Sequence, residues 1–190
     1  MTIGNLRPAT VLIDETAILH NVQHEVARLK KQTQLFAVVK ADAYGHGMLR
    51  VAHVAKAAGA SGFCVALLDE ALDLRAANYT EPVLVLGIVP SQYAAIAAAQ
   101  TVSLPLSSVD WLKQALPVLE AQPELPPLRL HIALDTGMGR IGFTDDQTLL
   151  DAVAFIQAHP KAFTIEGIFT HFATADDPDD AYFCLLYTSP

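Results

Sequence analysis

The fold of this chain is constrained above all by an alternation of short apolar runs with longer segments of helical periodicity. The runs are continuous and rich in β-branched residues, a pattern typical of strands buried on both faces of a parallel sheet. They cover residues 10–13, 35–39, 62–67, 82–87, 102–106, 128–134 and 163–170. We therefore expect an α/β fold in which strands and helices alternate.

Amphipathic helices are predicted in several of the intervening segments. They cover residues 18–29 behind the N-cap candidate Asp14, 51–58 before Gly59, 109–119 after the capping candidates Ser107 and Ser108, and 149–156 before His159-Pro160. Pro117 predicts a break or kink in the third helix, because proline has no backbone N–H to donate. Strands joined by helices form right-handed crossovers, either in a closed (β/α)₈ barrel or in an open, doubly wound sheet. Periodicity does not distinguish these two folds.

A single lysine stands where one of the apolar runs ends. The run Leu35-Phe-Ala-Val-Val leads to Lys40, and the polar segment Ala41-Asp-Ala-Tyr-Gly-His-Gly47 follows. An ammonium group at the end of an apolar strand must find a counter-charge, lose its proton or bond covalently, because desolvating a lone charge is costly. The covalent outcome is a Schiff base with an aldehyde cofactor. The alternative is a lysine whose head reaches solvent beside an ordinary turn.

Composition and charge are typical of a globular intracellular chain. The 190 residues are 52% hydrophobic and 17% charged, which suits a buried core and argues against disorder. A net charge of −8 argues against nucleic acid or an anionic membrane as a partner. Cys64 and Cys184 are too few for a disulfide framework or a zinc site, and no signal peptide or membrane-spanning run is visible. We expect a cytoplasmic protein in which Cys64 is a small core residue.

Three segments, in this order along the chain, resemble bacterial alanine racemases that depend on pyridoxal 5′-phosphate. They are Val38-Val-Lys-Ala-Asp-Ala-Tyr-Gly-His-Gly47, Leu134-Asp-Thr-Gly-Met-Gly-Arg-Ile-Gly142 and Glu166-Gly-Ile-Phe-Thr-His-Phe-Ala-Thr-Ala-Asp176. The resemblance extends over residues 7–183 and implies an isomerase that interconverts L-alanine and D-alanine through a Schiff base, for cell-wall D-alanine supply. It also implies a homodimer for the full-length parent.

The first segment carries most of the roles that this resemblance implies. Lys40 would hold pyridoxal phosphate covalently and, once freed by the substrate, move the α-proton on one face. Tyr44 would donate a hydrogen bond to the cofactor phosphate; the alternative is a tyrosine half-buried at the rim of the barrel. Val38, which faces the same side of its strand as Lys40, and Leu86 are expected to line the cofactor pocket.

The second and third segments would supply the remaining contacts. Arg140 would reach the ring oxygen of the cofactor and the substrate carboxylate, whereas a surface arginine would pair with Asp145 or Asp146. Asp135 is expected to form the turn before Arg140. His171 would pack on the face of the pyridine ring as a platform; without the resemblance it is expected to be an ordinary core residue.

One position departs from the family pattern. Many members carry a carbamylated lysine two residues before the aspartate of the second segment, where the carbamate steadies the arginine. Here that residue is Ala133, so either another group, such as an anion or a water, holds Arg140, or the arginine is less well oriented. His131 shares the strand face of Ala133 and is expected to be an ordinary barrel residue. The acidic patch at Asp176–Asp180 lacks His or Cys partners, so we expect no metal site.

The resemblance also decides between the two folds. It implies an incomplete (β/α)₈ TIM-type barrel with about six of the eight strands, the run at 10–13 preceding the barrel, and no carboxyl-terminal β domain. Residues 1–183 would be the amino-terminal part of the barrel, and residues 184–190 a non-family tail from a truncation or a shifted frame. The second base of the family, a tyrosine of the carboxyl-terminal domain, would lie beyond Pro190. We therefore expect the fragment to be inactive.

Two other functions remain compatible with these residues. One is a non-catalytic barrel protein that binds pyridoxal phosphate for cofactor homeostasis, since such proteins also carry a lysine after the first strand. The second and third segments favour the racemase over this alternative. The other is an inert structural fragment, which absence of a cooperative melting transition would support.

Overall fold

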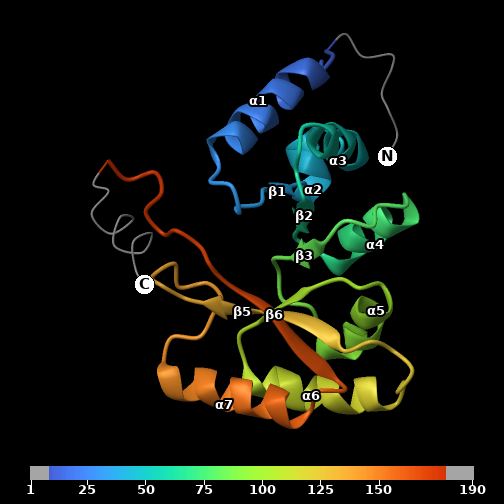
Figure 1. Ribbon diagram of the computed structural model, residues 1–190, viewed down its shortest axis with the longest axis vertical. Helices are drawn as coiled ribbons and strands as arrows, with labels where there is room; N and C mark the ends of the chain where they lie inside the picture. Colours follow the sequence, from blue (N-terminus) through green and yellow to red (C-terminus); the bar gives the residue numbers. More distant parts are fainter. Residues whose placement is uncertain (1–8, 179–190) are drawn as a thin grey trace. The chain divides into compact units, whose positions relative to one another are not determined.

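Parallel strands occupy six of the predicted apolar runs in the computed structural model, which describes residues 9–178 (Figure 1). They are β1 Phe36–Val38, β2 Gly62–Val65, β3 Val83–Val85, β4 Leu104–Leu106, β5 Leu128–Leu134 and β6 Phe163–Thr170, and they fall into two sheets. The strand prediction for residues 10–13 is wrong. Val11 and Leu12 are 82% and 89% exposed and pair with no strand, since this short run leads directly into the cap of the first helix.

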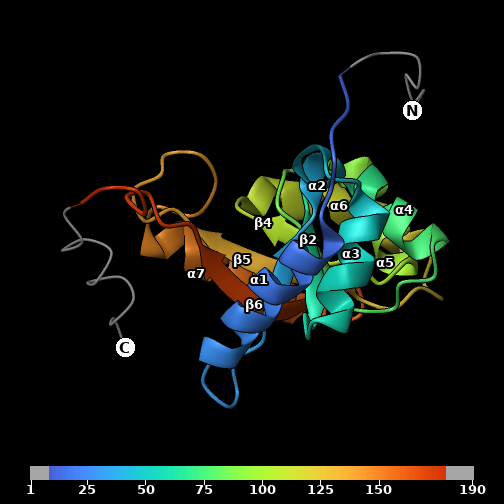
Figure 2. The ribbon, with the colours of Figure 1, turned by 90° about the horizontal axis from the view of Figure 1, so that it is seen from above.

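The chain divides into two compact units, Met1–Cys64 and Val65–Pro190. In the first unit, α1 (Glu15–Arg28) begins at the predicted cap, where the Asp14 carboxylate accepts hydrogen bonds from two backbone N–H groups at 2.9 and 3.0 Å. α1 packs against α3 (Met48–Ala57), as Figure 2 shows from above. β1 pairs in parallel with the start of β2. Cys64 is buried, as predicted, and burial raises the pKa of its thiol to about 11.

The second unit holds the longer sheet, in which β5 lies between β4 and β6 and pairs in parallel with both. Helices α6 (Val109–Glu120) and α7 (Asp146–Ala158) run along one face of this sheet (Figure 1). Fully buried apolar side chains fill this layer, among them Leu104, Leu106, Leu112, Leu128, Leu130 and Phe163. The apolar stripes of α6 and α7 and the leucine-rich strands therefore form one hydrophobic core.

Two helices of this unit were not predicted. α4 (Leu68–Ala76) has little contrast between its faces, and α5 (Ala94–Ala99), which follows the 3₁₀ turn η1 (Ser91–Tyr93), consists of alanine except for Ile96. Periodicity cannot reveal a helix whose residues are uniformly small and apolar. Of the break or kink predicted at Pro117, the break is wrong, because α6 continues through this residue to Glu120. Pro117 and Lys113, one turn earlier, are both exposed, so water can hydrate the carbonyl that loses its donor.

No helix among residues 9–178 combines the length and apolar character needed to cross a bilayer.

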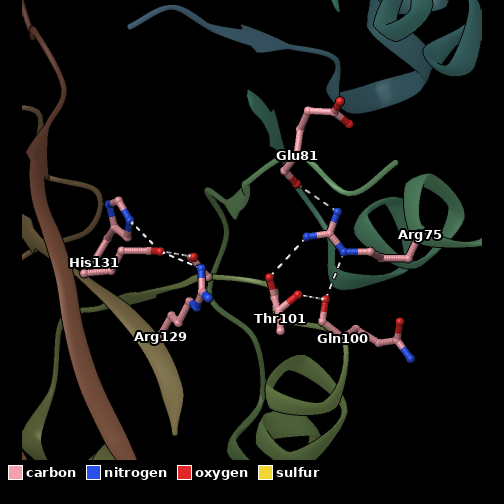
Figure 3. A network of polar contacts seen from close by, with 8 residues as sticks. Arg75, Glu81, Gln100, Thr101, Arg129 and His131 are labelled. Atoms are coloured by element: carbon pink, nitrogen blue, oxygen red, sulfur yellow. Dashed lines mark hydrogen bonds and ion pairs between the residues drawn. The ribbon is translucent and has the colours of Figure 1, made fainter. Parts of the chain in front are cut away.

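Arg75, at the end of α4, joins two loops that lead into β3 and β4. Its Nη1 donates to the carbonyls of Tyr79 and Glu81 at 2.8 and 2.9 Å. Its Nε and Nη2 donate to the carbonyls of Gln100 and Thr101 at 2.9 and 3.1 Å. The guanidinium lies between the two loops and faces both of them (Figure 3). A single side chain therefore satisfies four carbonyls at the amino ends of two neighbouring strands.

We expect Arg75→Met to lower the free energy of unfolding by about 2–3 kcal/mol, because four backbone carbonyls lose a charged donor. Urea unfolding followed by fluorescence measures this, since Trp111 is the single tryptophan of the chain and lies in the same unit. The exposed Arg28, which forms a surface ion pair with Glu25, gives the matched control: Arg28→Met should cost less than about 0.5 kcal/mol. Equal effects of the two substitutions would contradict the role of Arg75.

Candidate functional site

The residues that follow β1 form a left-handed helical turn. α2 (Lys40–Gly45) has positive φ angles between 51° and 55° at four successive residues, Ala41, Asp42, Ala43 and Tyr44. None of these is glycine, and each L-residue in this conformation costs about 1–2 kcal/mol. Strain of this kind persists only where surrounding contacts enforce it, and it concentrates at functional sites. The turn after β1 is thus the first structural sign of a site.

Asp42 is the residue that enforces this turn. Its Oδ1 accepts from the backbone N–H of Met48 at 2.8 Å, which caps the start of α3. Its carbonyl accepts from the N–H of Gly47 at 2.9 Å, and the N–H of Ala43 donates to the carbonyl of Val39 at 2.9 Å. The left-handed turn is therefore tied to the strand before it and to the helix after it. Sequence reasoning missed this role, because Ala-Asp-Ala-Tyr has no intrinsic preference for positive φ.

The turn brings Tyr44 against Lys40. The Lys40 ammonium lies 5.8 Å from the centroid of the Tyr44 ring, which is within cation–π range. Lys40 directly follows the buried Val39, while Val38, the last residue of β1, is 42% exposed, so this strand is not buried on both faces as its apolar run predicts. Within residues 9–178, no carboxylate forms an ion pair with Lys40. An unpaired amine beside a phenol suits a ligand that carries both an aldehyde and a phosphate.

In the second unit, the loop after β5 closes on itself. The N–H of Asp135 donates to the carbonyl of Phe143 at 3.0 Å, and the N–H of Phe143 donates to the carbonyl of Ala133 at 2.8 Å. Inside the loop, the Asp135 carboxylate accepts from the N–H groups of Gly137 and Gly139, each at 3.0 Å. These bonds hold the pKa of Asp135 below its usual value and confirm its predicted role as a turn former.

Gly142 completes the neck of this loop. Its φ is +132°, and a Cβ there would lie 2.3 Å from the backbone nitrogen of Asp135. Only glycine permits this approach.

Arg140 is exposed on this loop. In the described part of the chain it forms no ion pair with Asp145 or Asp146, which leaves the surface-pair alternative without support. The Asp145 carboxylate instead caps α7, where it accepts from the N–H and the hydroxyl of Thr148 at 2.9 and 2.7 Å.

His171 follows the carboxyl end of β6 and is exposed. Because β5 and β6 are parallel, Arg140 and His171 both follow the same edge of their sheet; Figures 1 and 2 show the two segments leaving there.

The predicted site residues thus fall into two groups. Lys40, Tyr44 and Val38 belong to the first unit, and Arg140, His171 and Leu86 to the second. Leu86 is half-buried directly after β3, and its N–H donates to the carbonyl of Val65 at 2.7 Å. Ala133 is 1% exposed and lies opposite Phe169 in the strand register. Every one of these residues stands at or near the carboxyl end of a parallel strand, where α/β proteins build active sites.

A polar network on the sheet of the second unit was missed. Between β5 and β6 the register shifts, so that Leu130 pairs with Ile165 and His131 with Gly167, and Glu166 is the extra residue of a β-bulge. The bulge turns Glu166 toward Arg129 and His131, both of which are labelled in Figure 3.

The carboxylate of Glu166 has three partners. Arg129 Nη1 donates to it at 3.0 Å, His131 Nε2 lies 3.2 Å away, and the buried Ser103 hydroxyl donates to the oxygen that contacts His131. A Cβ at Gly167 would lie 2.9 Å from the His131 ring, so this glycine makes room for the imidazole. His131 is therefore part of a network and not an ordinary barrel residue. The sequence did contain a sign of this network, namely a glutamate inside an apolar strand with a glycine after it.

Metal ligands are not gathered anywhere in the described residues, where no group of three or more His, Cys, Asp or Glu side chains could hold an ion. Residues 179–190, including part of the acidic patch and the predicted non-family tail, lie outside the described residues.

These observations define a class: an α/β protein whose unpaired lysine, phenol, arginine and histidine follow the carboxyl ends of parallel strands. Residues 13–185 match the family model described as the alanine racemase N-terminal domain. The chain therefore belongs to the alanine racemase family.

Relatives support this assignment over the same region. The chain is 85% identical over 183 residues to the alanine racemase of Lacticaseibacillus casei strain BL23, covering 96% of this chain and 48% of that protein. The crystal structure of alanine racemase from E. faecalis superposes with a TM-score of 0.89 at 48% identity, over 96% of this chain and 49% of that one. The structure of histidine racemase from Leuconostoc mesenteroides subsp. sake superposes with a TM-score of 0.80 at 36% identity, over 91% of this chain and 45% of that one. The chain thus spans about half the length of these relatives.

This likeness identifies the two parallel sheets as part of the family's barrel domain. The predicted incomplete (β/α)₈ barrel is confirmed, and the open, doubly wound sheet is excluded.

The Glu166 network makes a prediction for acid stability. Burial raises the pKa of Glu166, but hydrogen bonds from Ser103 and His131 and the charge of Arg129 outweigh burial and hold the pKa below its usual value. A carboxyl whose pKa is lower in the folded state stabilises the fold above its unfolded pKa, and this stabilisation is lost as pH falls through the folded pKa. Urea unfolding between about pH 6 and pH 3 should therefore show Glu166→Gln to be destabilising at the upper end, with the difference in the free energy of unfolding shrinking as pH falls.

The matched control is the exposed loop residue Glu124. Glu124→Gln should leave the pH profile of the free energy of unfolding unchanged. A Glu166→Gln profile parallel to that of the unsubstituted chain would contradict the stabilising network.

Proposed function

We propose that this chain supplies the cofactor-binding half of an alanine racemase, which interconverts L-alanine and D-alanine with pyridoxal 5′-phosphate. The observation that carries the proposal is the strained turn that places Tyr44 beside the unpaired Lys40 at the end of β1. Backbone strain of this kind clusters at functional sites, so four successive left-handed residues support a site at this turn. The alanine racemase family, to which the chain belongs, supports the same conclusion.

Each predicted residue has a distinct task in this proposal. Pyridoxal phosphate, when bound, supplies a ring that withdraws negative charge from the substrate Cα. Lys40 holds the cofactor aldehyde and then carries the α-proton on one face through its Nζ. Tyr44 donates a hydrogen bond from its phenol hydroxyl to the cofactor phosphate.

The second unit contributes orientation in this proposal. The Arg140 guanidinium binds the substrate carboxylate through two parallel N–H donors, and the closed loop fixes its backbone. The His171 ring packs against the cofactor ring. Val38 and Leu86 form apolar walls that exclude water from the reacting atoms.

Inversion requires a proton carrier on each face of the substrate, and Lys40 accounts for one. We propose that the second comes from the half of the full-length enzyme that the relatives contain and that the enzyme acts as a cytoplasmic homodimer. The 190-residue chain by itself should then show no turnover above that of free pyridoxal phosphate.

Alanine is favoured as the substrate by the 85% identity to a racemase named for alanine. The similarity to a histidine racemase makes substrate choice a necessary part of the test. A chimera serves this purpose: residues 1–183 of this chain replace the matching part of the Lacticaseibacillus casei racemase.

The first prediction of this proposal concerns Lys40. Incubating the chimera with pyridoxal phosphate, reducing it with borohydride and mapping its peptides should place the label on Lys40. Lys40→Ala should abolish the label and the visible absorbance of the bound cofactor, because it removes the amine that lies beside Tyr44. The exposed Lys161 provides the control, since Lys161→Ala should change neither. Labelling confined to another lysine would refute the assignment.

The second prediction concerns Arg140. In the chimera, Arg140→Ala should reduce kcat/KM for alanine by a factor that corresponds to about 2–4 kcal/mol, because the substrate carboxylate loses a charged partner. Cofactor absorbance should largely persist, which separates loss of substrate binding from loss of folding. Arg140→Lys should recover only part of the activity, since an ammonium lacks the planar pair of donors. Kinetics unchanged from those of the unsubstituted chimera would exclude Arg140 from the site.

A further inference from the structure

Two threonine hydroxyls connect the loop that carries Arg140 with the strand that leads to His171. Thr136 is the second residue of the loop, and Thr170 is the last residue of β6. Their Oγ1 atoms lie 2.7 Å apart, and the Thr170 hydroxyl also donates to the carbonyl of Leu134, at the end of β5, at 2.8 Å. Three hydrogen-bonding groups from two strands and one loop thus form a continuous chain.

The direction of the protons in this chain follows from valence. A hydroxyl has one proton and two lone pairs. The Thr170 proton is used on the Leu134 carbonyl, so Thr170 must accept in its contact with Thr136. The Thr136 proton therefore points at Thr170. Removing the Thr170 hydroxyl breaks both bonds, whereas removing the Thr136 hydroxyl breaks one.

The other bonds described for this loop lie within it and its neck. Asp135 binds the N–H groups of Gly137 and Gly139, and its backbone pairs with Phe143. These contacts fix the internal shape of the loop but do not set its position relative to β6. The pairing of Leu134 with Thr170 places the start of the loop beside β6, and the Thr136–Thr170 contact extends this connection into the loop itself.

We propose that Thr136 and Thr170 are positioning residues, and that their paired hydroxyls hold the Arg140 loop in register with the strand end that bears His171. The proposal rests on the function proposed for Arg140. It implies that substrate affinity depends on a hydroxyl pair that contacts neither the substrate nor the cofactor. Thr170 should matter more than Thr136, because it carries two of the hydrogen bonds.

Amide hydrogen exchange tests the Thr136–Thr170 contact without reference to activity. In the 190-residue chain and in the chimera, each without cofactor, Thr170→Val should raise the exchange rate of residues 136–142 by about tenfold, as expected for loss of one or two hydrogen bonds. Thr136→Val should give a smaller increase, and Thr170→Ser, which keeps the hydroxyl, should restore the original rate. Thr164→Val makes the same chemical change at an exposed residue of the same strand and should have no effect on the loop.

Steady-state kinetics of the chimera test the consequence for the site. Thr170→Val should raise KM for alanine several-fold while changing kcat little, because the arginine loses its position but not its chemistry. Thr170→Ser should return KM toward its original value. A substitution that only destabilised the fold would lower the active fraction and therefore kcat, leave KM unchanged, and not be rescued by serine.

The two proposals fail in different ways. If the unsubstituted chimera neither binds pyridoxal phosphate nor racemises alanine, the proposed function is wrong, while loop exchange still decides whether the Thr136–Thr170 contact positions the loop. If Thr170→Val and Thr164→Val have the same loop exchange rate and the same KM, the positioning role of the Thr136–Thr170 contact is refuted. Lys40 and Arg140 would retain their roles in that case. Faster exchange with unchanged KM would also overturn the positioning role.

Discussion

Parallel hydrogen bonding between strands is the constraint on which the rest of this structure depends. It requires each strand to run in the same direction as its partners, so within a sheet all carboxyl ends meet at one edge. Arg140 and His171 are 31 positions apart in the printed sequence, yet each follows a strand that ends at this edge. The helices between the strands bury the outer faces, which leaves the loops at the carboxyl ends free to carry chemistry.

The two ends of the strands are specialised differently in the second unit. Near the amino ends of β3 and β4, Arg75 binds four backbone carbonyls, a contact that serves stability. The bulge at Glu166 adds an ionic network in the middle of β6. At the carboxyl ends, hydrogen bonds shape the Asp135 loop and join Thr136 to Thr170. Polar groups near the amino ends thus stabilise the sheet, whereas in the proposed function those at the carboxyl ends orient the groups that bind a ligand.

The turn after β1 shows why local sequence could not specify the whole site. Lys40 and Tyr44 were identified from their motif, but the left-handed path between them was not, because alanine, aspartate and tyrosine favour other conformations. The contact of Asp42 with α3 offsets part of the free energy that this path costs. His131 and Glu166 were likewise misjudged or overlooked, since a register shift between two strands is not visible in either strand alone.

The sequence by itself determined the six strands β1 to β6, the helices α1, α3, α6 and α7, the caps Asp14 and Ser108, and the candidate residues Lys40, Tyr44, Arg140 and His171. These follow from apolar periodicity, capping chemistry and motif, which are all encoded within short segments. Tertiary structure alone decided that residues 10–13 form no strand and that α6 continues through Pro117. It also decided that Thr170 contacts Thr136 and that Glu166 occupies a bulge. Each of these depends on which backbone or side-chain partner a distant segment brings within hydrogen-bonding distance. Local propensity does not specify that partner.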